Sequence, residues 1–170
     1  MKNKIKLLDN NLINKIAAGE VIDRPSSILK ELIENSIDAD AKSIDIYIHR
    51  DKIDMFHISD DGVGISKNDL RIAFDRHATS KITDTNDLEK ITSFGFRGEA
   101  LSSIAAISDV KLTSSRNSKG GDRIHIRFGK EISLEPSPSS EGTSISIENI
   151  INNDPARKKF LKTNKTEYNH

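Results

Sequence analysis

The sequence predicts one α+β domain, a two-layer α/β sandwich in which helices cover a mixed, largely antiparallel sheet. Helical periodicity appears over residues 11–38 and again near the middle of the chain. Most of the second half consists of short alternating segments joined by turns rich in Gly, Asn, Ser and Pro. Helices and strands segregated in this way favour such a sheet over repeated βα units. The 170 residues suffice for one domain, 1–170, with a sizeable core.

The composition excludes several kinds of site. Lys plus Arg and Asp plus Glu each number 26, so net charge gives no argument for nucleic acid, and any such contact must come from a local patch. Cysteine is absent, which excludes disulfides, thiolate zinc sites and cysteine nucleophiles and fits a reducing cytoplasm. The sequence shows neither a signal-peptide pattern nor a long apolar run, so we expect a cytoplasmic protein without membrane contact.

Two helices are expected first. Residues 11–23 carry Leu and Ile at helical spacing, and Arg24-Pro25 ends this helix because the residue before proline is pushed out of the helical region. Pro25 suits the first turn of a second helix that runs to about Asp38.

A β-hairpin follows. In Ser43–His49, isoleucines alternate with polar residues, which predicts a strand with one buried face. Asp51-Lys52 forms a tight turn, and Ile53–Ser59 is the second strand.

The later elements are shorter. Ser66–Asp69 resembles a capping box with Asp in place of Glu, so a helix is expected to about Phe74. Residues 76–81 and 136–141 are interpreted as loop and surface turn, and residues 83–91 as loop with a short helix. The remaining predicted elements are a helix over Glu99–Ile107 and strands over Val110–Ser114, Arg123–Phe128, Glu131–Leu134 and Thr143–Glu148. Residues 150–170 are interpreted as a basic C-terminal helix, which Asp154 and Pro155 would start, or as the start of the next segment.

The first candidate site lies on the helix that begins at Pro25. Glu31, Asn35 and Asp38 fall within an arc of about 60° on this helix. A carboxylate can take a proton from water, and an amide oxygen can hold Mg²⁺, which prefers oxygen ligands. The alternative is the solvated polar face of an ordinary amphipathic helix.

The second candidate site is Asp60-Asp61-Gly62-Val63-Gly64, directly after an apolar strand. Glycines let the backbone approach a flat ligand, and a carboxylate at the strand end can accept the amine hydrogen of adenine. A plain turn is the alternative. A calcium-binding EF-hand loop is excluded because Arg71 stands where its twelfth-position Glu is required.

The third candidate site precedes the helix at residue 99. Gly95 and Gly98 expose backbone N–H groups that suit phosphate oxygens, and Arg97 adds a cation. An ordinary loop with a helix cap remains the alternative. Arg76–Lys81 adds hydroxyls and a lysine. The basic cluster from Arg157 to Lys165 suits either nucleic-acid phosphates or a solvated helix face.

Together these motifs resemble the N-terminal ATPase region of the MutL family of DNA mismatch repair proteins. The resemblance covers about residues 5–170 and rests on five runs, namely Asn14–Pro25, Lys30–Ser36, Arg76–Lys81, Gly95–Leu101 and Pro155–Leu161. The Gly-Phe-Arg-Gly-Glu-Ala-Leu run is specific to this family. The Glu/Asn helix and the Asp-x-Gly-x-Gly loop also occur in gyrase B subunits, heat-shock chaperones and sensor histidine kinases.

The resemblance implies the Bergerat (GHKL) ATP-binding fold, with ATP and Mg²⁺ as ligands. It makes Glu31 the general base, Asn35 the Mg²⁺ ligand and Asp60 the reader of adenine. The other residues that it assigns to nucleotide binding are Gly62, Gly64 and Thr143 around the base, and Thr79, Lys81, Gly95, Phe96, Arg97 and Gly98 around the phosphates.

The resemblance also implies partners. In the family, ATP binding dimerises this domain and couples mismatch recognition to strand incision and unwinding, so repair proteins, DNA and a second copy of the chain are expected partners. Family members continue into a second domain whose lysine reaches the γ-phosphate. Its absence here predicts weak ATP hydrolysis, and a non-catalytic or decayed fragment that binds DNA or a repair partner is the alternative.

Three departures from the family pattern are predicted to matter. Asp40 stands where Gly is usual after the first motif, and Asp61 replaces a common Asn and adds charge near the base. Residues 152–155 also differ from the usual aromatic-Asn-Thr/Val-Pro sequence.

Overall fold

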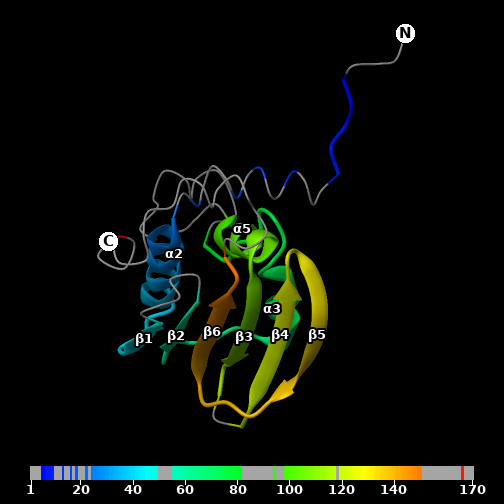
Figure 1. Ribbon diagram of the computed structural model, residues 1–170. Coiled ribbons are helices and arrows are strands. Elements are labelled where there is room, and N and C mark those ends of the chain that lie inside the picture. The colour runs from blue at the N-terminus through cyan, green and yellow to red at the C-terminus, as the bar shows by residue number, and fades with distance from the viewer. Residues whose placement is uncertain are drawn as a thin grey trace.

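Six strands form one open sheet, and helices lie against one of its faces (Figure 1). This computed structural model describes residues 5–9, 13, 16, 18, 22, 24–49, 55–81, 94, 98–117, 119–150 and 166. The elements are α2 (Pro25–Asp38), β1 (Ile44–Ile48), β2 (Phe56–Asp60), α3 (Lys67–Ile72), α5 (Ala100–Ile107), β3 (Asp109–Ser115), β4 (Gly121–Arg127), β5 (Lys130–Ser137) and β6 (Gly142–Glu148).

The strand order is β1-β2-β6-β3-β4-β5, and every described pairing is antiparallel. The predicted α+β class is confirmed. The last strand, β6, inserts between β2 and β3, although the three are far apart in the sequence. This insertion sets Thr143 directly opposite Asp60 in the β2–β6 register.

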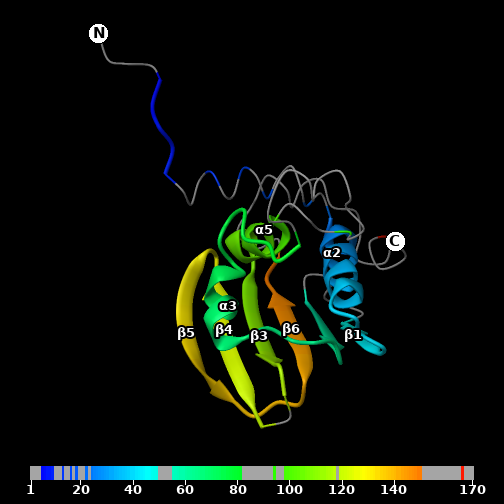
Figure 2. The same ribbon diagram turned by 180° about the vertical axis from the view of Figure 1, so that it is seen from behind.

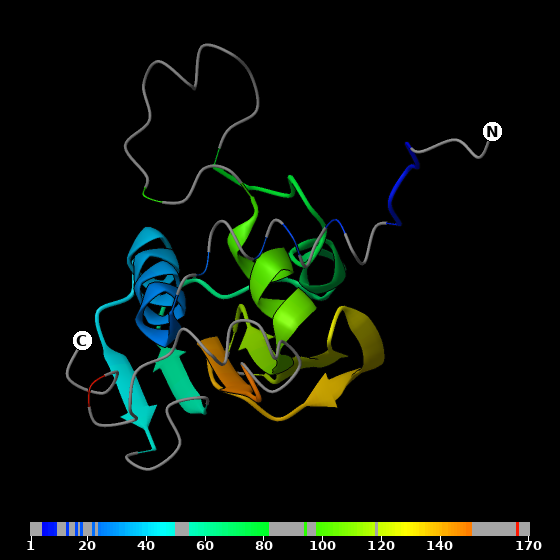
Figure 3. The same ribbon diagram turned by 45° about the horizontal axis from the view of Figure 1, so that its top comes forward.

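The helices form the second layer. Figure 3 shows α2, α5 and α3 on the same side of the sheet, and Figure 2 shows α3 from behind, over the half that contains β4. Their apolar residues meet those of the strands in one core, whose largest fully buried side chains include Ile28, Leu70, Ile104, Leu112, Ile124 and Ile147. The opposite face of the sheet carries the alternate residues of each strand.

Helix α2 begins and ends where local chemistry dictates. Arg24 is its extended N-cap, and Pro25 occupies the first turn, where a missing N–H costs nothing. The buried positions Pro25, Ile28, Leu32 and Ser36 recur at helical spacing. The polar residues of the first motif therefore stand beside the buried stripe.

Strand β1 differs from its prediction. It pairs only with β2 among the described strands, so it is an edge strand. Ile46 is 39% exposed and Ile48 40% exposed, and thus the predicted buried face is wrong. Alternating isoleucines indicate which side of a strand faces the helices. They do not indicate that the helices bury an edge strand only in part.

Other boundaries shift by a few residues. Strand β5 continues through Pro136 to Ser137, although residues 136–141 were predicted as a turn. A proline is tolerated there because β5 is also an edge strand. The helix expected over 11–23, the 51–52 turn, the 83–91 segment and the C-terminal helix with its basic cluster lie wholly or mostly outside the described residues. None of the described helices is long and apolar enough to cross a membrane.

Candidate functional site

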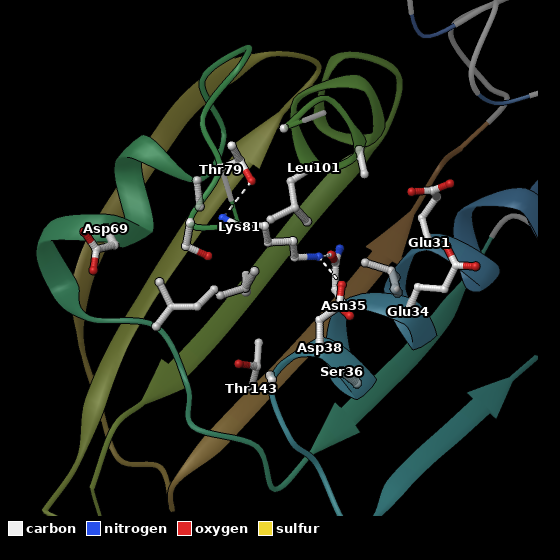
Figure 4. A pocket seen from close by; sticks show the side chains of 18 of the residues that line it. Glu31, Glu34, Asn35, Ser36, Asp38, Asp69, Thr79, Lys81, Leu101 and Thr143 are labelled. Atoms are coloured by element: carbon white, nitrogen blue, oxygen red, sulfur yellow. Dashed lines mark hydrogen bonds and ion pairs between the residues drawn. The ribbon is translucent and has the colours of Figure 1, made fainter. Parts of the chain in front are cut away.

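A cleft of about 1080 Å³ opens between α2, the loop after β2, the 76–81 loop and the start of α5 (Figure 4). Eight of the predicted site residues line it, namely Glu31, Asn35, Asp60, Gly64, Thr79, Lys81, Gly98 and Thr143. Gly62 does not line the cleft, although its N–H donates to the lining residue Asp60, and Gly95, Phe96 and Arg97 lie outside the described residues. Segments far apart in the sequence thus converge on one cavity.

The Asp60 carboxylate is held by three donors. The Ser36 hydroxyl donates to Oδ2 at 2.7 Å, and the backbone N–H groups of Gly62 and Thr143 donate to Oδ1 at 3.0 and 3.2 Å. An ionised carboxylate offers about four acceptor positions. One position therefore remains for a donor in the cleft, and it belongs to Oδ2, which carries a single bond.

Thr143 stands beside this carboxylate on β6. Its hydroxyl pairs with the buried Ser114 hydroxyl at 2.9 Å, which also donates to the carbonyl of Gly142 at 2.9 Å. The N–H of Ile65 donates to the same Ser114 oxygen at 2.8 Å. This polar network fixes the floor of the cleft next to Asp60.

Two glycines allow close packing around the cleft. Gly64 has a φ of +66°, and a Cβ there would lie 2.0 Å from the carbonyl oxygen of Ser115. Gly98 has a φ of +62°, and its Cβ would lie 2.4 Å from the carbonyl oxygen of Ala78. Because no side chain fits at either position, each glycine lets its loop lie directly on a neighbouring segment.

The α2 side of the cleft carries the first motif. Lys81 Nζ donates to Asn35 Oδ1 at 3.0 Å and forms an ion pair with Asp38. Figure 4 shows Lys81 reaching from its loop toward these two residues, with Glu31 further along α2. Glu31 also lines the cleft, and its carboxylate forms no hydrogen bond or ion pair with the other residues that the structure describes.

The 76–81 loop and the start of α5 are tied together. Glu99 Oε1 lies 3.4 Å from Arg76 Nη2 and 3.6 Å from His77 Nδ1. The His77 N–H also donates to the Gly98 carbonyl at 2.9 Å. These contacts join two segments that were predicted separately to face phosphates.

Asp40 follows the end of α2 in a left-handed backbone conformation. Asp40 has a φ of +60°, and the N–H groups of Asp40 and Ala41 bond to the carbonyls of Ile37 and Ser36. This is the Schellman pattern that usually carries glycine. Asp40 therefore adopts a glycine-like conformation at a cost in strain.

The carboxylate of Asp61 bonds to the backbone ahead of β1. Its Oδ1 accepts the N–H groups of Lys42 and Ser43 at 2.7 and 2.8 Å. The bonds from Ser43 and Lys42 lower the pKa of this carboxyl below its ordinary value. Asp61 thus anchors the turn before β1 and does not itself line the cleft, and its added charge near the base pocket stays a prediction.

Sequence analysis missed Ser36 and Ser114, and it gave Asp38 no role beyond its place on the polar arc. Ser36 is buried and bonds to Asp60, and Ser114 is buried under Thr143. The position of Ser36 on the apolar stripe of α2 could have indicated its role. No local sequence pattern indicates the role of Ser114.

The donor set also fits a hard cation. An amide oxygen from Asn35 and a carboxylate from Asp38 already surround the positive charge of Lys81. These are the oxygen types that Mg²⁺ selects. The described residues contain no group of three or more acidic or histidine side chains arranged as a metal site.

The class of protein follows from the fold, this cleft and a family comparison. Residues 24–154 match the family described as histidine kinase-, DNA gyrase B- and HSP90-like ATPases. The match covers more than half of the chain, so the chain belongs to this ATPase family.

Within this class, the chain is similar to MutL, the DNA mismatch repair protein. It is 49% identical over 165 residues to MutL of Limosilactobacillus reuteri (strain DSM 20016), covering 96% of this chain and 25% of the relative. It is 48% identical over 164 residues to MutL of Bacillus mycoides (strain KBAB4), covering 96% and 26%. The chain thus spans about a quarter of the length of these curated relatives.

Solved structures agree. The crystal structure of the N-terminal domain of a DNA repair protein matches with a TM-score of 0.74 and 28% identity over 92% of this chain and 45% of that one. The Aquifex aeolicus MutL ATPase domain complexed with ADP matches with a TM-score of 0.63 and 29% identity over 88% and 52%. The resemblance predicted from the sequence is confirmed, and the alternative of a non-catalytic fragment is not favoured.

Proposed function

We propose that this chain is the ATP-binding and ATP-hydrolysing module of a MutL-like DNA mismatch repair protein. One observation carries the proposal. The Glu31–Asn35 face of α2 and the Asp60 carboxylate line the same cleft, and Lys81 reaches Asn35 from the 76–81 loop. The ADP complex of a structural relative supports a nucleotide as the ligand.

The base would bind at the β2 end. Asp60 has one acceptor position left, which suits the exocyclic amine of adenine. Three donors fix the carboxylate, so it needs little reorganisation when the base arrives. Gly64 and Thr143 line the same end and leave room for a flat ring.

The phosphates would extend toward the 76–81 loop and Gly98. Lys81 supplies a positive charge there, and Thr79 a hydroxyl. Asn35 would hold Mg²⁺, which neutralises phosphate charge when it is bound. Gly95, Phe96 and Arg97 keep the phosphate-binding role that the family resemblance gives them.

Hydrolysis would proceed by attack of water on the γ-phosphorus. Glu31 takes a proton from the water as its oxygen bonds to phosphorus, and the bond between the γ-phosphorus and the bridging oxygen breaks to leave ADP and inorganic phosphate. Positioning and charge neutralisation supply most of the rate in such transfers. One helical turn separates Glu31 from Asn35, so the base and the Mg²⁺ ligand project into the cleft together.

The similarity to the MutL relatives supports the proposed role in repair. ATP-dependent pairing with a second copy, contact with DNA, and signalling to mismatch-recognition and strand-incision proteins in the cytoplasm follow from that role. The chain covers a quarter of the length of the first of these relatives, so the role of the whole protein is proposed from the similarity.

Calorimetric titration with Mg²⁺ and the non-hydrolysable analogue AMP-PNP tests the proposal. We expect saturable binding to one site, and none of it after heat denaturation. Glu31→Ala should bind the analogue as the parent chain does but lose measurable ATP turnover, because it lacks the base and keeps the pocket. Glu131→Ala, a matched change that removes only the exposed pair with Arg71 outside the cleft, should retain both. Equal loss of binding in Glu31→Ala would contradict the assigned role.

A further inference from the structure

Asp38, the last residue of α2, holds the lysine that the proposed function assigns to phosphates. The Lys81 ammonium pairs with Asp38 and donates to Asn35 Oδ1 at 3.0 Å (Figure 4). The side chains of Lys81 and Asp38 are only 17% and 11% exposed. In such shielded surroundings, a charge that loses its partner is costly.

A carboxylate is unexpected at this end of a helix. The carbonyl groups that end α2 place the negative end of the helix dipole beside Asp38, which disfavours an anion. The last turn of α2 contains no basic residue to offset it. The offsetting cation comes instead from Lys81, on a loop more than 40 residues later.

Asp38 also contacts a second segment. The backbone N–H of Phe94 donates to its Oδ1 at 3.4 Å, while Lys81 occupies Oδ2. The carboxylate therefore ties two separate stretches of chain to the end of α2.

We propose that Asp38 is a positioning residue that keeps Lys81 on the Asn35 amide while the cleft lacks nucleotide. A triphosphate would then take Lys81 from Asp38, and the Asn35 oxygen would become available to Mg²⁺. Lys81 and Mg²⁺ compete for the same amide oxygen in this scheme. The inference rests on the proposed function and adds to it a residue that controls how readily the cleft accepts its ligand.

The proposal predicts that Asp38→Asn increases the affinity of the cleft for nucleotide. The substitution keeps the size of the side chain and removes its charge. The positive charge of Lys81 then has no carboxylate partner in the empty cleft, and the phosphates of a bound nucleotide provide the missing negative charge. We expect AMP-PNP to bind about tenfold more tightly, a coupling of ordinary size between two linked equilibria.

The test is calorimetric titration of AMP-PNP at a series of Mg²⁺ concentrations. Asp38→Asn should bind more tightly and reach half-maximal binding at lower Mg²⁺ than the parent chain. Its melting temperature without nucleotide should fall, and the rise on adding nucleotide should exceed that of the parent. Asp122→Asn, which removes a similarly shielded carboxylate from a pair with Lys67 outside the cleft, should match the parent.

The opposite result overturns the proposal. Weaker or unchanged binding by Asp38→Asn, or a higher Mg²⁺ requirement, would mean that Asp38 assists the cation or only supports the fold. If the parent chain itself binds no AMP-PNP, the proposed function fails as well. Binding by the parent without tighter binding by Asp38→Asn removes this inference alone.

A second measurement uses the unaltered chain. The side-chain ammonium of Lys81 can be observed by NMR after ¹⁵N-lysine labelling and assigned from the spectrum of Lys81→Arg. We expect its signal to shift in proportion to site occupancy as Mg²⁺ and AMP-PNP are added. A signal that stays unmoved at saturation would show that Lys81 keeps its partners, and the proposal would be wrong.

Discussion

Asp60→Asn tests how the cleft recognises its base. Asp60 Oδ1 accepts two backbone N–H groups, from Gly62 and Thr143. These two donors require an oxygen, so the asparagine amide must place its NH₂ group where Oδ2 stands. Ser36 can then turn its hydroxyl to accept from that NH₂. The fold should therefore survive with a loss of about 1 kcal/mol, the usual contribution of one hydrogen bond.

The effect on adenine is much larger. The acceptor that remained for the exocyclic amine becomes a donor, so a bond to a charged group is lost and two donors face each other. A bond to a charged group contributes roughly 1.5–3 kcal/mol, and a buried polar group without a partner costs about 1–3 kcal/mol more. We take about 3 kcal/mol for the sum, which is a loss of about 150-fold in affinity.

Calorimetry with two ligands separates recognition from folding. AMP-PNP should bind Asp60→Asn about 150-fold more weakly than the parent chain. Purine riboside triphosphate lacks the exocyclic amine, so the parent and the variant should bind it with similar affinity. An equal loss for both ligands would point to a damaged fold, and no loss for AMP-PNP would refute the assignment of Asp60 to the base.

Three further predictions concern stability. Asp40→Gly should raise the melting temperature by about 2–4 °C, because it relieves roughly 1 kcal/mol of strain at a φ of +60°. Gly64→Ala should lower the free energy of unfolding by about 3–5 kcal/mol in urea titration, since its Cβ would meet a backbone oxygen at 2.0 Å; a loss below about 1 kcal/mol would contradict the observed packing. Burial acts to raise the pKa of Asp109, but hydrogen bonds from Arg127 and His125 outweigh it and lower this pKa. The stability that Asp109 contributes should therefore be complete above about pH 3.9 and lost as the pH falls through the lowered value, and melting curves of Asp109→Asn should lack this step.

Local chemistry made much of the fold predictable. Pro25 fixed the start of α2, and its predicted end at Asp38 agrees with the structure. The alternating β-branched segments marked each later strand to within a few residues. The burial of β1 was mispredicted because alternation carries no information on which strand lies at an edge.

The assembly of the site was less predictable. Asp60 and Thr143 are 83 residues apart and meet only because β6 inserts beside β2. Thr143 entered the sequence analysis through the family resemblance alone. The pairing of Lys81 with Asp38 depends on how a loop folds back over α2, and no spacing rule encodes such a contact.

A crystal structure of the chain with Mg²⁺ and AMP-PNP tests the central claim most directly. The account predicts adenine against Asp60 and Thr143, the triphosphate beside Lys81 and Gly98, and Glu31 facing the γ-phosphate. A nucleotide bound elsewhere, or bound in this cleft with its base remote from Asp60, would contradict it.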